Sequence, residues 1–372
     1  MIFSYFEGII KMTKKILLTP KDKEYEPPNG LDVESSFRRV GILNPAVIQR
    51  GKNVLLYSRL IYEDGEELNS CIVKNHCVLG EDKIKIKRDK GGFPLEELVF
   101  QAQEPHGMQG VEDFRASFVE DEEPTHGFLV NYDGKNARTE YVRTNIDNQW
   151  DKFGVWFPNI KLSRALKLIG NQGGGKYKQR WLKEYSFGNP DELFLGTKDC
   201  AMFSLKVNGK KGVIIRILPD IQIVYVDDPI ELAKEEFWEE TIKNLESKVL
   251  LEREQDWEAS HIGLAGPPFE IDQGVIIPYH GVVMEPERNY KFGLALVDKD
   301  NPQKVLARTK KPVLEATESW EENGVVPGKV VFPTGHAIYN DKIHWLYGAG
   351  DKYVACCSMD KREMLNSLGN GK

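Results

Sequence analysis

The sequence lacks the short motifs that mark the commonest hydrolases, metalloenzymes and disulfide-stapled proteins. It has no G-x-S-x-G nucleophile motif, no H-E-x-x-H pair among its seven histidines and no C-x-x-C spacing among its five cysteines. We therefore expect neither a serine hydrolase of the elbow type nor a metal site. An odd number of unpaired cysteines favours free thiols in a reducing compartment, so we expect a cytoplasmic protein.

Two further absences narrow the range of partners. No stretch approaches the roughly 18 apolar residues that a membrane-spanning helix needs. The formal net charge is -7, so there is no basic excess to neutralise phosphates of a nucleic acid. We expect no membrane partner and no nucleic-acid partner.

What the chain does contain is enough apolar material for a large core and a long series of strand signals. Hydrophobic residues make up 41% of it and aromatic residues 10%, which argues against disorder. Residues 1–40 are expected to be a poorly structured lead-in, and 41–372 a single domain. Hairpin turns are predicted at 50–53, 207–210 and 339–342, where Gly, Asn and Asp separate apolar runs.

One motif, an apolar run flanked by polar residues, a short polar turn and a second apolar run, occurs five times. Its copies start at Asn44, Asp113, Lys198, Gly266 and Pro333, which lie 69, 85, 68 and 67 residues apart. A module of that length suits a four-stranded propeller blade. The sequence therefore predicts an all-β fold, a five-bladed β-propeller with an axial active site.

Two segments depart from the strand pattern. The spacing of apolar residues over 230–252 predicts one long helix. The enlarged connection at 145–197 explains the 85-residue interval and is where we expect substrate specificity to be determined. It contains Gly170 to Lys176, spaced like a phosphate-binding loop, but Tyr177 follows where a hydroxyl for magnesium is needed. We interpret it as a flexible basic loop.

Polar residues recur at the ends of the five motifs and suggest one assembled site. Neighbouring residues of a strand point to opposite sides, so only one of Glu112 and Asp113 is expected to face the axis. An acid surrounded by several cations suits a polyhydroxylated or anionic ligand. The further polar residues at matching points of the motifs are Asn44, Arg59, Lys198, Arg216, His280 and Asp351.

In these motifs the chain resembles glycoside hydrolase family 130, the β-mannoside phosphorylases and related mannosidases. The resemblance runs from about Asn44 to Asp351 and rests on NPAV, GVEDFRAS, YDGKNAR, KDCAMF, GPPFEIDQGVIIPYHGV, LALVDKDNPQKVLARTKKPVLE, VVFPTG and YGAGD, in that order. It implies a five-bladed propeller and an inverting phosphorolysis of β-linked manno-oligosaccharides to α-mannose 1-phosphate. No cofactor is implied, because inorganic phosphate is the co-substrate.

The resemblance also implies roles for individual residues. Asp113 would be the single general acid, acting on the glycosidic oxygen through a hydroxyl of the bound mannose. The residues that would hold the mannose are Asn44, Arg59, Lys198 and Asp351. Those that would bind phosphate are Arg138 and Lys198, with Arg216 and His280 added by position.

Some positions depart from the family pattern and leave alternatives open. The acid motif has Phe114 where Pro is usual, and Ile215 replaces a histidine before Arg216. An inverting exo-β-mannosidase therefore stays possible, with Glu258 or Glu270 as the base that activates water. A non-catalytic carbohydrate-binding propeller is the third alternative. The sequence leaves the linkage and any homo-oligomer undetermined.

Overall fold

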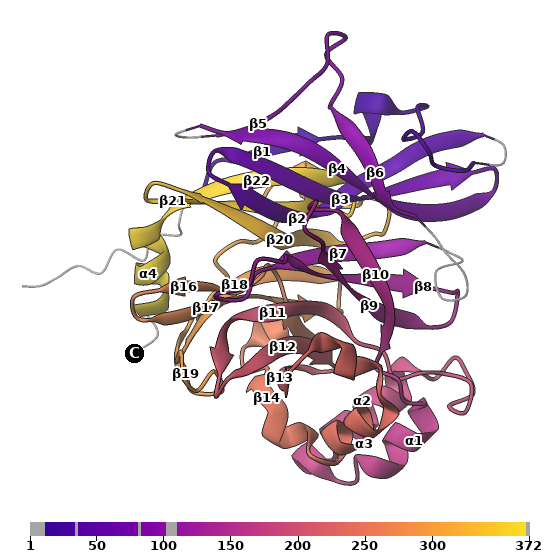
Figure 1. The fold of residues 1–372 in the computed structure, drawn as a ribbon, viewed down its shortest axis with the longest axis vertical. Coiled ribbons are helices and arrows are strands. Elements are labelled where there is room, and N and C mark those ends of the chain that lie inside the picture. Colours follow the sequence, from indigo (N-terminus) through magenta and orange to yellow (C-terminus); the bar gives the residue numbers. More distant parts are fainter. Residues whose placement is uncertain (1–11, 34–35, 81–82, 102–109, 370–372) are drawn as a thin grey trace, which may run out of the picture.

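The computed structural model describes residues 12–33, 36–80, 83–101 and 110–369. The chain is mostly β, as the sequence predicts, and its strands form several curled sheets (Figure 1). All three predicted hairpin turns are present, since Arg50 pairs with Asn53, Val207 with Lys210 and Tyr339 with Lys342. The asparagine of the second turn adopts φ 51° and its glycine φ 78°, the left-handed backbone that such turns require.

The first three sheets follow one another along the chain, and neighbouring strands pair antiparallel. The first sheet consists of β2 (Phe37–Arg50), β3 (Asn53–Asp64), β4 (Glu67–Leu79), β5 (Ile84–Ile86) and β6 (Glu96–Phe100). The second consists of β7 (Val111–Ser117), β8 (His126–Tyr132), β9 (Ala137–Thr144) and β10 (Trp150–Phe157). The third consists of β11 (Lys198–Val207), β12 (Lys210–Ile217), β13 (Asp220–Val226) and β14 (Val249–Leu251).

A nine-stranded sheet completes the fold and has two antiparallel halves. The first half holds β15 (His261–Leu264), β16 (Phe269–Ile271), β17 (Gly274–Val283), β18 (Asn289–Val297) and β19 (Val305–Arg308). The second holds β20 (Lys329–Tyr339), β21 (Lys342–Ala349), β22 (Tyr353–Asp360) and β1 (Lys14–Leu18). A short parallel pairing of Asn289 with Lys329 and Tyr290 with Val330 joins the halves.

The prediction that residues 1–40 have little structure is wrong for Lys14–Leu18. This segment is strand β1, which pairs antiparallel with β22 at the other end of the chain. The Lys14 ammonium lies 2.7 Å from a carboxylate oxygen of the buried Glu321. The short helix η1 (Pro20–Lys23) follows β1 along the chain. Strand β2 begins at Phe37, ahead of the predicted domain start at residue 41.

The predicted helix over 230–252 is wrong in length. The segment forms η3 (Pro229–Ala233), α3 (Glu235–Lys243) and η4 (Leu245–Lys248) and ends in β14. Lys234 interrupts it with an extended backbone, at φ -79° and ψ 131°. The helical periodicity of the apolar residues instead comes from three short pieces that each bury one side.

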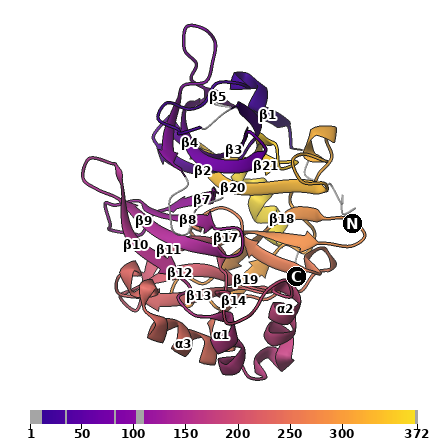
Figure 2. The same ribbon diagram turned by 90° about the vertical axis from the view of Figure 1, so that its right-hand side faces the viewer.

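The prediction that residues 170–176 form a flexible loop is also wrong. The connection 145–197 contains α1 (Leu162–Leu168), η2 (Gln172–Gly175) and α2 (Lys176–Glu184), which gather with α3 at one end of the molecule (Figures 1 and 2). Gly173, Gly174 and Gly175 all have positive φ, a backbone that side chains rarely tolerate. The Lys176 ammonium lies 2.7 Å from a carboxylate oxygen of Asp220, so the glycine run is attached to the third sheet.

The helices pack on the sheets through large aromatic side chains. Trp181 of α2 and Trp238 of α3 are fully buried in one core with residues of β9, β10, β12 and β13. The Phe157 and Trp238 rings stack with centroids 5.8 Å apart, and the Trp181 indole donates a hydrogen bond to the Leu218 carbonyl. The remaining helical elements are η5 (Asp256–Glu258), η6 (Ser319–Glu321) and α4 (Lys361–Gly369).

All five cysteines are free and buried. Within the ranges that the structure describes, no helix is both long enough and apolar enough to cross a membrane.

Candidate active site

Three strands reach the site with the same backbone irregularity. Asn44, Asp113 and Asp199 have φ of 49°, 33° and 56°. Each lies where the strand register shifts by one residue, in the pairs β2–β3, β7–β8 and β11–β12. Asn and Asp are the non-glycine residues that best tolerate a left-handed backbone. These shifts are β-bulges, which turn side chains away from the regular alternation.

The bulge in β7 corrects one prediction. Glu112 and Asp113 do not face opposite sides; both line the same cavity. Three steps along β7, from Glu112 to Arg115, match only two steps along β8. The extra residue breaks the two-residue period, so adjacent carboxylates reach one space.

The cavity has a volume of about 310 Å³, which is in the range of small-molecule sites. Of the predicted residues, Asn44, Arg59, Asp113, Lys198 and Asp351 line it. The other lining residues are Leu43, Ile61, Leu68, Glu112, Arg288, Tyr290, Val325, Val326, Val330 and Phe332.

Asp113 is held at the cavity wall by two residues of the first sheet. The Asn44 amide nitrogen donates a 2.8 Å hydrogen bond to Asp113 Oδ1, and an Arg59 nitrogen lies 3.9 Å from the same oxygen. Asn44 in turn packs against Gly348, where an added Cβ would lie 1.8 Å from the Asn44 side-chain oxygen. The glycine therefore makes room for the residue that orients Asp113.

Glu112 bridges two cations of the cavity. Its Oε1 lies 3.2 Å from Arg59 Nη2, and its Oε2 lies 2.7 Å from Lys198 Nζ. Burial by itself would raise the pKa of Glu112, but attraction to Lys198 and Arg59 outweighs it and lowers the pKa to about 2. The carboxylate is therefore ionised at neutral pH.

Asp351 lies in the turn between β21 and β22 and has φ 53°. Its carboxylate forms an ion pair with Arg288, whose guanidinium stacks over the Tyr290 ring at 5.1 Å. Burial, with a contribution from the charge of Asp113, raises the pKa of Asp351 although Arg288 opposes this. Asp351 is thus the third carboxyl group among the lining residues, after Glu112 and Asp113, and it belongs to the last sheet's side of the cavity.

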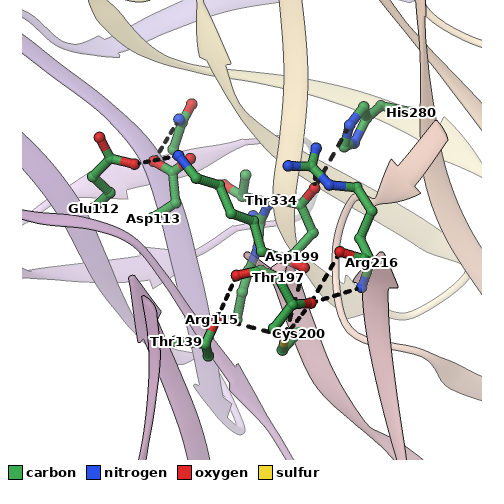
Figure 3. A network of polar contacts seen from close by, with 12 residues as sticks. Glu112, Asp113, Arg115, Thr139, Thr197, Asp199, Cys200, Arg216, His280 and Thr334 are labelled. Atoms are coloured by element: carbon green, nitrogen blue, oxygen red, sulfur yellow. Dashed lines mark hydrogen bonds and ion pairs between the residues drawn. The ribbon is translucent and has the colours of Figure 1, made fainter. Parts of the chain in front are cut away.

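Next to Lys198 in the sequence, Asp199 is the centre of a buried cluster with Arg115, Arg216 and His280 (Figure 3). Asp199 accepts contacts from Arg216 Nη1 at 2.9 Å and from Arg115 Nη2 at 3.2 Å. Burial would raise the pKa of Asp199, yet the arginines lower it to about 2. Burial lowers the pKa of His280 to about 3, so this ring is neutral at neutral pH.

Several predicted residues do not line the cavity. Arg216 and His280 belong to the Asp199 cluster. Arg138 is buried, donates to the carbonyls of Trp156 and Pro158, and stacks over Phe194 at 4.1 Å. Its place away from the cavity reflects the alternation of β9, where Thr139 instead bonds to the Thr197 carbonyl.

The two suggested hydrolytic bases also lie elsewhere. Glu258 is fully buried, 3.0 Å from Arg308, and accepts a hydrogen bond from the Tyr279 hydroxyl. Glu270 pairs with Lys299 at 3.6 Å, with both side chains exposed. Neither residue is among those that line the cavity.

The connection 145–197 does not cover the cavity, contrary to our expectation of a specificity loop. No residue from it is among the lining residues. Its last residue instead contacts the Asp199 cluster, since Thr197 Oγ1 donates to the Arg216 carbonyl at 3.0 Å and accepts from the Arg216 amide.

A family model described as β-1,4-mannooligosaccharide phosphorylase matches residues 176–370. The chain belongs to glycoside hydrolase family 130. A β-1,2-mannobiose phosphorylase from Thermoanaerobacter sp. (strain X514) is 26% identical to this family 130 chain over 341 residues, which cover 89% of this chain and 94% of that protein.

Solved structures of family 130 share the fold. The β-1,2-mannobiose phosphorylase of Listeria innocua, in complex with β-1,2-mannobiose, has a TM-score of 0.64 at 21% identity, covering 95% of this chain and 97% of that one. A structure described with glycoside hydrolases that target β-1,2-mannosidic linkages in Candida mannan has a TM-score of 0.67 at 16% identity, covering 96% of both chains.

Within this family 130 fold, sequence reasoning missed Glu112, Arg288 and Tyr290 as cavity residues. The sequence did hold a signal for Glu112. Aspartate tolerates the left-handed backbone of a bulge, and a bulge at Asp113 would bring the carboxylates of both residues to one side. Arg288 and Tyr290 flank the start of β18 and belong to no motif repeat, so only the pairing of β18 with β20 brings them to the cavity.

Gly263→Ala is expected to destabilise the Asp199 cluster. A Cβ there would lie 2.4 Å from His280 Cε1 and 2.5 Å from Asp199 Oδ2, which forces both side chains to move. We expect the free energy of unfolding to fall by about 1–3 kcal/mol, measured by chemical denaturation. Gly266→Ala is the matched control, since its nearest neighbours lie 3.6 Å away. Equal stability of the two variants would contradict the packing argument.

Proposed function

We propose that this family 130 chain is an inverting β-mannoside phosphorylase that cleaves β-linked manno-oligosaccharides in the cytoplasm. The observation that carries the proposal is the Asp113 carboxyl group, held by Asn44 and Arg59 in a cavity that Lys198 and Arg288 also line. The two Thermoanaerobacter relatives and the Listeria innocua structure are named as phosphorylases of β-mannobiose or β-oligomannan, which supports the same reaction.

We further propose that the fold is a five-bladed propeller. The first three sheets each supply four or five strands. The nine-stranded sheet divides at the short β18–β20 pairing into two antiparallel groups. In the second group, the N-terminal β1 completes a blade made otherwise from the C-terminal strands, and this arrangement would join the two ends of the ring.

In the proposed reaction Asp113 donates its proton to a hydroxyl of the bound mannose, and that hydroxyl passes a proton to the glycosidic oxygen. The bond from the anomeric carbon to that oxygen breaks, while phosphate oxygen forms a new bond to the anomeric carbon from the opposite face. The products are α-mannose 1-phosphate and the shortened acceptor. Inversion follows because a single displacement occurs on the face opposite the leaving group.

The mannose would be held by Asn44, Arg59, Lys198 and Asp351, all of which line the cavity. For phosphate we retain Lys198 and Arg216; the Arg216 side chain is 14% exposed beside Asp199. Arg138 and His280 are left out of the proposed phosphate site, because Arg138 donates to backbone carbonyls and His280 is a neutral ring at neutral pH.

An inverting β-mannosidase is the second candidate, and the charge of the cavity favours it. The lining side chains comprise three cations and three carboxylates, so the cavity has no formal positive excess for phosphate. Glu112 is ionised beside Asp113, which is the state that a base for water requires.

One assay separates the two candidates. The protein is incubated with β-1,2-mannobiose and with β-1,4-mannobiose, each with and without inorganic phosphate, and the products are resolved by chromatography. We expect mannose 1-phosphate to form only with phosphate. Release of mannose at the same rate in both conditions would contradict the phosphorylase proposal, and saturable binding without turnover would indicate a carbohydrate-binding propeller.

A further inference from the structure

The cavity holds its own anion, Glu112, between two of its cations. Arg59 and Lys198 come from β3 of the first sheet and β11 of the third sheet, and Glu112 of β7 lies between them. Each carboxylate oxygen serves a different cation, Oε1 at 3.2 Å from Arg59 and Oε2 at 2.7 Å from Lys198. The pairs are largely shielded from solvent, since the side chain of Glu112 is only 16% exposed.

We propose that Glu112 is a positioning residue that holds Arg59 and competes internally with phosphate for Lys198. This inference rests on the proposed function, because it concerns phosphate at the same site. With the site empty, the Glu112 carboxylate holds the two cations at a fixed spacing. When phosphate enters, its oxygens must share the Lys198 ammonium with Glu112 or displace that carboxylate.

The competition has two opposite consequences. The negative charge of Glu112 offsets part of the attraction between the cavity and phosphate, because like charges at a few ångströms repel strongly where water is scarce. The same carboxylate restricts two long side chains to one geometry, and this lowers the entropy cost of binding the sugar. Loss of Glu112 should therefore improve anion binding while it impairs catalysis.

Glu112→Gln separates these effects because it removes the charge and retains the size. The full-length variant is titrated with inorganic phosphate and with sulfate by isothermal titration calorimetry. We expect both anions to bind roughly three- to tenfold more tightly than to the original protein, with a larger gain at low ionic strength. In phosphorolysis, KM for phosphate should fall while kcat also falls.

Glu122→Gln is the matched control. Glu122 also bridges two lysines, Lys206 and Lys211, each at 3.1 Å, and its side chain is 14% exposed. It lies outside the cavity, so this variant should leave anion affinity and KM for phosphate unchanged. Glu112→Asp retains the charge and should leave anion affinity close to that of the original protein.

The outcomes distinguish this inference from the proposed function. If the enzyme hydrolyses mannosides without phosphate, the calorimetric gain for Glu112→Gln is still expected, and only the phosphorylase proposal is lost. Unchanged or weaker anion binding in Glu112→Gln, in a variant that melts like the original protein, would overturn the competition. If Glu112→Gln does not fold, Glu112→Asp is measured in its place at two ionic strengths. We expect its anion affinity to equal that of the original protein and its kcat to differ. A weaker dependence of anion affinity on salt than in the original protein would count against the proposal.

Discussion

Asp113→Asn is expected to lower the rate of mannoside cleavage by roughly 10²–10⁴-fold, the usual contribution of a positioned general acid. The amide is the size of the carboxyl group, and its oxygen can still accept the hydrogen bond from Asn44. The cavity should therefore keep its shape and lose only the proton donor. The measurement is kcat and kcat/KM on β-mannobiose with saturating phosphate.

Asp121→Asn is the control for this variant. Asp121 also has a left-handed backbone, with φ 59°, and it is exposed in the connection between β7 and β8. The same chemical change there should leave the rate unaltered. If Asp113→Asn retained more than a tenth of the original rate while folded, Asp113 would not be the general acid.

Asp199→Ala is expected to destabilise the fold by about 3–5 kcal/mol, because removal of one member of a buried ion pair leaves uncompensated charge. Asp199 is 5% exposed and lies against Arg115 and Arg216, which belong to β7 and β12. Both guanidinium groups would remain buried without their carboxylate. The measurement is the free energy of unfolding in guanidinium chloride, compared with the original protein.

The exposed pair of Asp227 with Lys210 supplies the control. Asp227→Ala removes a carboxylate from solvent-exposed charges and should change stability little. Equal losses in the two variants would mean that burial does not govern the strength of the Asp199 cluster.

The same carboxylate predicts how stability changes in acid. In the folded chain the pKa of Asp199 is lowered from the ordinary 3.8 to about 2. A lowered pKa means that the stabilisation is complete above pH 3.8 and is lost as pH falls towards 2. Unfolding free energies measured from pH 5 to pH 2 should fall less steeply for Asp199→Ala than for the original protein.

Much of the cavity was predictable because its residues lie in motifs with a fixed place in the repeat. Asn44 and Lys198 open their motifs, and Asp351 closes the last one. Lys198 begins β11 and Asp351 lies in the turn between β21 and β22, and strand ends in repeated sheets meet at common places. Asn44 instead lies within β2, at the bulge between Leu43 and Ala46. The motifs were sufficient to identify these residues, but the bulge at Asn44 is a feature of the strand pairing.

The position of Arg138 could not be predicted from a sequence motif. Its motif indicated a phosphate contact, but the register of β9 directs its side chain towards Phe194 and the backbone of residues 156 and 158. A one-residue difference in register reverses the side that a residue faces. Pairing between strands decides the register, and a single motif does not contain it.

The sequence by itself determined that the chain is mostly β, that hairpin turns occur at its Asn and Gly pairs, and that it belongs with the mannoside-cleaving family, because these depend on local patterns. Tertiary structure decided that Glu112 joins Asp113 in the cavity and that Arg288 faces Asp351. A bulge and a pairing between strands from distant parts of the chain place these charges. Both depend on contacts that neighbouring residues do not encode.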